Sequence, residues 1–229
     1  MNLNNINSIL CKGNDLMGDS LSILSLNHQH LMFVIDGLSS CSQPQKATNL
    51  CRKILENKFY NQEILDANEL KESLYKVHNE LLKLKEDLRC CISGVFISYD
   101  QIIVFNVGDC RVYGFTNNKI TRITKDDTIV QELIDKNIIN NIEALMHHDA
   151  GIITQSLGSL KKIDIHLQLC ETIYDSFLIV TDGLSGMFSD EHLLKIYIAN
   201  KDKGFLEKLS EMAVLNHQPD DQAGILIRN

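Results

Sequence analysis

The sequence lacks the features that would direct a chain into or across a membrane. None of its apolar runs approaches the roughly 20 residues that a helix needs to span a bilayer. The Asn-rich N-terminus, MNLNNINSILCKGND, has no early positive charge and no long apolar block, which argues against a secretory signal. We therefore expect a cytoplasmic protein with no membrane partner.

Cysteine spacing and charge exclude two further classes of protein. The seven cysteines are an odd number without any Cys-x-x-Cys spacing, so neither a zinc site nor a disulfide framework is predicted. Reduced thiols fit a cytosolic protein. The net charge is −8, with 22 Lys and Arg against 30 Asp and Glu, and the basic residues are scattered. Because nucleic-acid binding depends on clustered basic side chains, we expect no nucleic-acid partner.

The chain also has only two prolines, no tryptophan and no repeat or low-complexity linker, but it contains a regular order of strand-like and helical segments. Its 229 residues suit one large domain or two small ones. Apolar positions recur at helical spacing over 44–59 and 67–87, and the leucine stripe over 70–84 is expected to face the core. Short turns between strands favour a helix-flanked antiparallel β architecture over a doubly wound parallel sheet. Further helices are predicted near 127–137, 141–147, 189–200 and 203–216, and strands within 20–26, 30–36, 92–100, 101–115, 119–124, 163–169, 175–181 and 223–229.

Two apolar runs end on the same four residues, Asp-Gly-Leu-Ser. The first is MFVIDGLSS, which contains Asp36 and Gly37, and the second is SFLIVTDGLSG, which contains Asp182. A single Asp-Gly is more often a turn than a ligand. If the two strands lie side by side, however, both carboxylates meet at one edge of a sheet, an arrangement that suits a hard metal ion.

Three more acidic residues fall at predicted strand ends. Asp19 precedes the first predicted strand, and Asp220 and Asp221 precede the last. Carboxylates, together with a backbone carbonyl such as that of Gly37, are the oxygen ligands that Mg²⁺ and Mn²⁺ prefer. The residues therefore indicate a site for such ions, and the missing Cys and His spacing argues against zinc.

In these motifs the chain resembles the bacterial metal-dependent serine/threonine protein phosphatases of the protein phosphatase 2C type. The match is ordered and covers nearly the whole chain, so a single catalytic domain over residues 1–229 is expected. The N-terminal segment is closer to the sporulation-E-like branch, which carries Gly-Asp-Ser there. The matching segments, in order, are GNDLMGDSLSIL, FVIDGLSS, IVFNVGDCRVYGF, ITKDDTIVQELIDKNII, GIITQSLGS, LIVTDGLSGMFSDEHL and DDQAGILIR.

The resemblance implies an α+β fold, a four-layer α-β-β-α sandwich of two antiparallel sheets flanked by helices. It also implies a centre of two Mn²⁺ or Mg²⁺ ions, with Asp36 and Asp182 as the catalytic residues. Carried over by position, Asp36 bridges both ions and the Gly37 carbonyl binds one. The other ligands implied are Asp182 and Asp220 on the second ion, Asp19 nearby through water, and Asp109 at a weak third ion.

The activity implied by the resemblance is hydrolysis of phosphoserine or phosphothreonine in a protein substrate, opposing a serine/threonine kinase. Two ions about 3.5–4 Å apart lower the pKa of a shared water, and the hydroxide attacks the phosphorus in line. No protein nucleophile is needed, and none of the cysteines is followed by an arginine six positions later.

Departures from the family pattern keep an alternative open, namely a catalytically impaired member that acts as a phosphoprotein-binding regulatory module. Leu38-Ser39-Ser40 stands where the family usually has a variable residue and two glycines. Gly186 stands where many bacterial relatives have a metal-binding aspartate, and Ala223 falls in the altered closing motif.

Several individual assignments also stay open. Asp109, in the run Asn106–Asp109, belongs to a third-metal element or caps local backbone donors. Either Asp220 or Asp221 is the closing ligand. We expect Arg111 to make a structural ion pair and the pair His147-His148 to lie at the surface.

Overall fold

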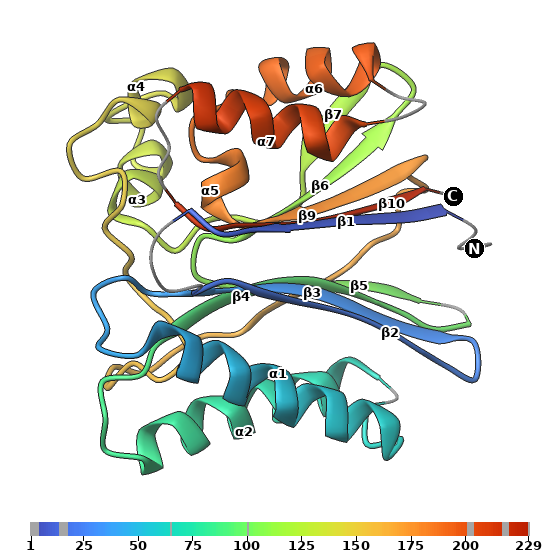
Figure 1. Cartoon of the computed structure of the whole chain (residues 1–229), viewed down its shortest axis with the longest axis vertical. Coiled ribbons are helices and arrows are strands. Elements are labelled where there is room, and N and C mark those ends of the chain that lie inside the picture. Colours follow the sequence, from blue (N-terminus) through green and yellow to red (C-terminus); the bar gives the residue numbers. More distant parts are fainter. Residues whose placement is uncertain are drawn as a thin grey trace.

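The computed structural model describes residues 5–13, 18–64, 66–99, 101–200, 204–216 and 220–228. These residues form two five-stranded antiparallel sheets that lie face to face, with helices on both outer faces (Figure 1). The expected α+β fold, a four-layer α-β-β-α sandwich, is confirmed. Within the described residues, none of the helices combines the length and the apolar character needed to cross a membrane. The outer helices are α1 (Pro44–Tyr60) and α2 (Ala67–Lys83) on one face, and α6 (Asp190–Ala199) and α7 (Phe205–Leu215) on the other.

The two sheets have different strand orders, and all their paired neighbours are antiparallel. One sheet has the order β2-β3-β4-β5-β8 and the other β1-β10-β9-β6-β7. Strands of the first sheet are β2 (Ser20–Leu26), β3 (Gln29–Gly37), β4 (Cys90–Ile97), β5 (Ile102–Val107) and β8 (His166–Leu169). Strands of the second are β1 (Asn5–Cys11), β6 (Arg111–Thr116), β7 (Lys119–Arg122), β9 (Ser176–Val180) and β10 (Gln222–Arg228).

The helices follow the sequence signals closely. Pro44 occupies the first turn of α1, where its missing N–H leaves no hydrogen bond unmade. The side chain of Asp66 caps α2 by accepting a hydrogen bond from the backbone N–H of Glu69 at 2.9 Å. The predicted stripe packs in the core against the first sheet from Leu70 to Leu81, whereas Leu84, beyond the end of α2 at Lys83, is 41% exposed.

Strand β1 was not predicted, and its position explains why. It is an edge strand that pairs only with β10, from Asn5 opposite Arg228 to Cys11 opposite Gln222. Its side chains are exposed or half-buried, so the segment carries no alternating apolar face that would mark it as a strand. The β1 pairing is therefore decided by the partner strand.

The expectation that the two Asp-Gly strands lie side by side in one sheet is wrong. β3 belongs to one sheet and β9 to the other, so the two strand ends approach each other across the sandwich. The short helices α3 (Ile129–Asp135), α4 (Asn141–Leu145) and α5 (Asp182–Ser185) lie at one end of the sandwich (Figure 1). Apolar side chains of both sheets, including those of Val34 and Ile225, fill the space between them.

Candidate metal centre

Aspartates from five separate segments meet between the two sheets. Each lies at or next to the end of a strand, where the chain leaves the hydrogen-bonded sheet. Asp36 is the second-last residue of β3 and pairs with Cys91 of β4. The others are Asp19 before β2, Asp109 between β5 and β6, Asp182 at the start of α5 directly after β9, and Asp220 before β10.

Asp36 is the electrostatic centre of this group. Burial raises the pKa of its carboxyl group well above the ordinary value, and four neighbouring carboxylates raise it further. In decreasing order of effect these neighbours are Asp182, Asp19, Asp109 and Asp220. Burial likewise raises the pKa of Asp182 well above its ordinary value, and the neighbouring aspartates add to the effect. The five side chains therefore share one low-dielectric site in which their negative charges repel.

Asp19 is held in this group by a threonine that the sequence did not single out. The Thr181 hydroxyl donates a hydrogen bond to Asp19 Oδ2 at 2.8 Å and accepts one from the Ala223 backbone N–H at 3.0 Å. Burial raises the pKa of Asp19 to about 7, although the Thr181 hydrogen bond opposes the shift. The Asp19 carboxyl group is also within hydrogen-bonding distance of Asp36. Thr181 thus ties the N-terminal aspartate to β9 and β10.

The adjacent residues Asp220 and Asp221 have different surroundings. Asp221 is buried, and its carboxylate accepts hydrogen bonds from the backbone N–H groups of Gly13, at 2.8 Å, and Gly18. Asp220 is half-buried and raises the pKa of Asp19, Asp36 and Asp182. Asp221 therefore fastens the backbone beside Asp19 and also raises the pKa of Asp19, whereas Asp220 raises the pKa of three members of the cluster. Residues 14–17 of the predicted N-terminal motif lie outside the described residues.

Both Asp-Gly pairs need glycine because another segment comes close to its Cα. A Cβ at Gly37 would lie 2.7 Å from the Pro44 carbonyl oxygen and 2.8 Å from the Pro44 Cβ. A Cβ at Gly183 would overlap the backbone carbonyl of Asp221. Gly37 therefore allows the first residue of α1 to pack closely on the end of β3. Gly183 allows the backbone just before β10 to pack closely on α5.

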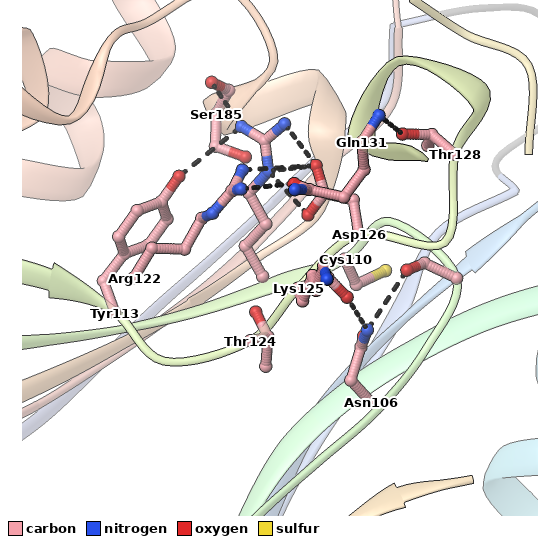
Figure 2. A network of polar contacts seen from close by, with 12 residues as sticks. Asn106, Cys110, Tyr113, Arg122, Thr124, Lys125, Asp126, Thr128, Gln131 and Ser185 are labelled. Atoms are coloured by element: carbon pink, nitrogen blue, oxygen red, sulfur yellow. Dashed lines mark hydrogen bonds and ion pairs between the residues drawn. The ribbon is translucent and has the colours of Figure 1, made fainter. Parts of the chain in front are cut away.

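Asp109 lies in a loop that a hydrogen-bonded network holds in place. The Asn106 side chain donates to the backbone carbonyls of Gly108 at 3.1 Å and Lys125 at 2.9 Å (Figure 2). Gly108 has a φ of 97°, and a Cβ there would overlap the Cys91 side chain, so only glycine fits. Burial, with a smaller contribution from Asp126, raises the pKa of Asp109 to about 6.

The Asp109 carboxyl group is hydrogen-bonded by the backbone N–H of its own residue, but only in part. Its Oδ1 atom is buried without a hydrogen-bond partner. Arg111, two residues later, makes the expected structural ion pair, with its Nη2 atom 2.7 Å from Asp126 Oδ2. An oxygen left unpaired among carboxylates that repel one another is an observation that favours a bound cation.

The oxygen-rich donor set fits hard divalent cations. Mg²⁺ and Mn²⁺ take carboxylate, carbonyl and water ligands, and a positive charge here would offset the repulsion that raises the pKa values of Asp36 and Asp182. In the described residues, no three of these aspartates bring ligand atoms within 4.8 Å of one another.

The departures from the family pattern leave this cluster intact. Leu38 is buried and packs in the core between the sheets, whereas Ser39 is exposed. A Cβ at Gly186 would lie 2.8 Å from the Asp182 carbonyl oxygen, so an aspartate there would require a shift of the short helix α5. His147, His148 and Asp149 bring their ligand atoms within 4.8 Å of one another elsewhere, and the His148 side chain is 82% exposed, in keeping with the predicted surface position.

The curated proteins that match this chain in sequence include bacterial serine/threonine phosphatases. The serine/threonine phosphatase stp of Listeria monocytogenes is 22% identical over 182 residues, which cover 74% of this chain and 72% of that protein. The serine/threonine protein phosphatase PstP of Mycobacterium tuberculosis is 28% identical over 137 residues, 59% of this chain. That match covers 26% of PstP, so the chain spans only about a quarter of the length of this curated relative.

Solved structures share the fold over nearly the whole chain. Serine/threonine phosphatase Stp1 of Staphylococcus aureus has a TM-score of 0.87 and 21% identity, and the match covers 98% of this chain and 94% of that one. The catalytic domain of PstP in complex with two manganese ions has a TM-score of 0.79 and 19% identity, covering 98% and 97%. The family model described as protein phosphatase 2C matches residues 12–218. Since this match takes in most of the sequence, the chain belongs to the protein phosphatase 2C family.

Proposed function

We propose that this protein is an Mn²⁺- or Mg²⁺-dependent serine/threonine phosphatase that hydrolyses phosphoserine or phosphothreonine in a protein substrate. The observation that carries the proposal is the convergence of four aspartates on Asp36, each of which raises its pKa. Family membership and the relatives named as serine/threonine phosphatases support it. A kinase that phosphorylates the same substrate is the natural opposing partner.

Two ions would be held by the oxygen atoms already gathered at the site. Asp36 and the Gly37 carbonyl would hold the ions together with Asp182 and Asp220, with Asp19 nearby and Asp109 as a ligand of a weaker third ion. Such ions would supply an activated water for attack on phosphorus and positive charge that offsets the charge on the phosphoryl oxygens.

The protein's own residues prepare the site for this chemistry. Thr181 and Asp221 fix Asp19 and the backbone around it, so that the carboxylate is positioned before a metal arrives. The raised pKa values of Asp36 and Asp182 mean that ion binding displaces protons, and metal affinity therefore rises with pH. A single domain over residues 1–229 is sufficient for every group named here.

The alternative, a catalytically impaired phosphoprotein-binding module, rested on the Leu38-Ser39-Ser40 loop and on Ala223. Leu38 packs into the core, and the Ala223 backbone anchors Thr181, so neither residue displaces an aspartate. We therefore keep it only as an outcome of the test.

The test is hydrolysis of a phosphothreonine peptide and of p-nitrophenyl phosphate with Mn²⁺, Mg²⁺ or chelator, comparing the wild type with Asp182→Ala. Metal-dependent turnover that is lost in the variant supports the proposal. Turnover that persists in chelator, or in Asp182→Ala, contradicts it. Folded protein that binds Mn²⁺ but hydrolyses neither substrate leaves the binding module as the explanation.

A further inference from the structure

A cavity of about 630 Å³ opens directly from the metal centre. Asp109 and Asp182 line it together with residues from the segment 128–151, which contains α3 and α4. This volume lies within the roughly 300–1,000 Å³ typical of sites that enclose a compact ligand. A group attached to a phosphate held at the aspartates would therefore enter this space.

Apolar side chains make up much of the remaining lining. Ile134, Ile142 and Leu145 contribute to it from α3 and α4, and Met187 contributes from the turn after α5. Ile142 is 72% exposed and Met187 is 46% exposed, although both are large apolar side chains. A cavity that keeps such side chains open to solvent gains free energy when an apolar group covers them.

The charged groups at the base of the cavity are already engaged with one another. Arg122 Nη2 donates to Gln131 Oε1 at 2.6 Å, and Arg111 forms its ion pair with Asp126 (Figure 2). Gln131 in turn donates to Asp135 at 3.1 Å. Because these partners satisfy one another, an incoming polar side chain could pair with them only by breaking existing hydrogen bonds, whereas an apolar one leaves them intact.

The remaining charges at the cavity are negative. Asp190 and Glu191, at the exposed N-terminus of α6, line it together with the aspartates of the metal centre. An acidic residue of a substrate would meet like charge there, at a cost in binding free energy. The negative charges thus discriminate against acidic side chains, and it is the apolar part of the lining that favours apolar ones.

We infer that this cavity is a specificity subsite for an apolar side chain that flanks the phosphorylated residue of the protein substrate. The inference rests on the proposed function, because the phosphate must lie at the aspartates for its neighbour to reach the cavity. An extended chain rises about 3.3 Å per residue, so residues one or two positions from the phosphorylated one can enter.

The experiment compares phosphothreonine peptides that are identical except for leucine, alanine or glutamate at one flanking position, scanned over two positions on each side. With Mn²⁺ present, we expect kcat/KM for leucine to exceed that for alanine by about tenfold at one position or more, and glutamate to be the poorest. A single apolar group in a pocket changes kcat/KM by roughly 10–200-fold, and this cavity is open. Values within twofold at every position would overturn the inference.

Two variants and a matched control locate the effect. Ile142→Ser and Met187→Ser should each lower the leucine-to-alanine ratio of kcat/KM at least threefold, because each removes part of the apolar wall. Ile138→Ser serves as the control, since Ile138 is 63% exposed on the same segment and does not line the cavity. A ratio that stays at the wild-type value in both wall variants, or that falls equally in Ile138→Ser, would also overturn the inference.

Hydrolysis of p-nitrophenyl phosphate separates the two possible failures. If neither it nor any peptide is hydrolysed with Mn²⁺, the proposed function fails and the subsite fails with it. If it is hydrolysed and the peptides react without preference, the phosphatase stands and only the subsite is wrong.

Discussion

The two Asp-Gly pairs look alike in sequence but are built into the fold differently. Asp36-Gly37 ends β3, pairs across the ladder with β4, and leads through an exposed loop to α1. Asp182-Gly183 follows β9 and begins the short helix α5 at once. The first glycine makes room for a helix start, and the second makes room for the backbone of Asp221.

This difference teaches that the repeated tetrapeptide marks two contributions to one site, not two copies of one turn. The strands belong to different sheets, and only the packing of sheet on sheet brings the carboxylates together. Four other aspartates raise the pKa of Asp36. The pKa of Asp182 is likewise raised by neighbouring aspartates, but the positive charge of Arg111 opposes this shift. The two halves should therefore respond differently to mutation.

Neutralising each aspartate gives the largest expected effect. Asp36→Asn should lower kcat/KM with Mn²⁺ by more than about a hundredfold, and Asp182→Asn should lower it somewhat less, because Asp36 is the carboxylate shared by the whole cluster. Even residues that only support metal ligands lower affinity or activity by about 10–100-fold when mutated. Kinetics and calorimetric Mn²⁺ titration provide the measurement.

The matched control is Asp164→Asn, an exposed position outside the metal centre, which should keep wild-type activity. The predicted role of the two aspartates is contradicted if Asp36→Asn or Asp182→Asn retains more than about a tenth of the wild-type kcat/KM. It is also contradicted if Asp164→Asn loses as much activity as those two variants.

Substituting each glycine tests the steric difference between the pairs. Gly183→Ala should destabilise the protein by about 3 kcal/mol or more, and Gly37→Ala by about 1–3 kcal/mol, in line with overpacking of a close contact. The larger effect is expected at Gly183 because its added Cβ would overlap a backbone carbonyl. Urea unfolding of the metal-free proteins measures both values.

Gly151→Ala is the control for the glycine pair, since a Cβ there meets nothing within 4 Å. It should change the free energy of unfolding little. Equal effects of Gly37→Ala and Gly183→Ala would show that the two contacts constrain the chain alike.

The pH dependence of the metal-free protein is the smallest expected effect. Folding raises the pKa of Asp19 from 3.8 to about 7 and that of Asp109 to about 6. The stability contributed by these protonated groups is fully present below pH 3.8 and is lost as pH rises through 6 to 7. Tm should therefore fall by several degrees between pH 5 and pH 8, and saturating Mn²⁺ should reverse the fall at pH 8.

Scanning calorimetry with and without Mn²⁺ checks this expectation. Asp36→Asn and Asp182→Asn should each flatten the fall in Tm of the metal-free protein, because each removes one repelling carboxylate. A Tm that rises from pH 5 to pH 8 in the metal-free wild type would contradict the electrostatic description of the centre.

The sequence by itself determined most of the local structure. Helical periodicity placed α1 and α2, strand-like runs placed β2 and β3, and each aspartate of the centre stood at a recognisable strand end. These signals are local, since side-chain alternation and turn residues depend on a few neighbouring positions. The ordered motifs also identified the family, because their order survives even where single positions differ.

Tertiary structure alone decided which segments meet. It put β3 and β9 in opposite sheets, gave β1 its place beside β10, and divided Asp220 and Asp221 between cluster and backbone anchor. It also brought Thr181 to Asp19 and opened a cavity between α5 and residues 128–151. Contacts between residues so far apart in the chain depend on how whole sheets and helices pack, and no local pattern records that packing.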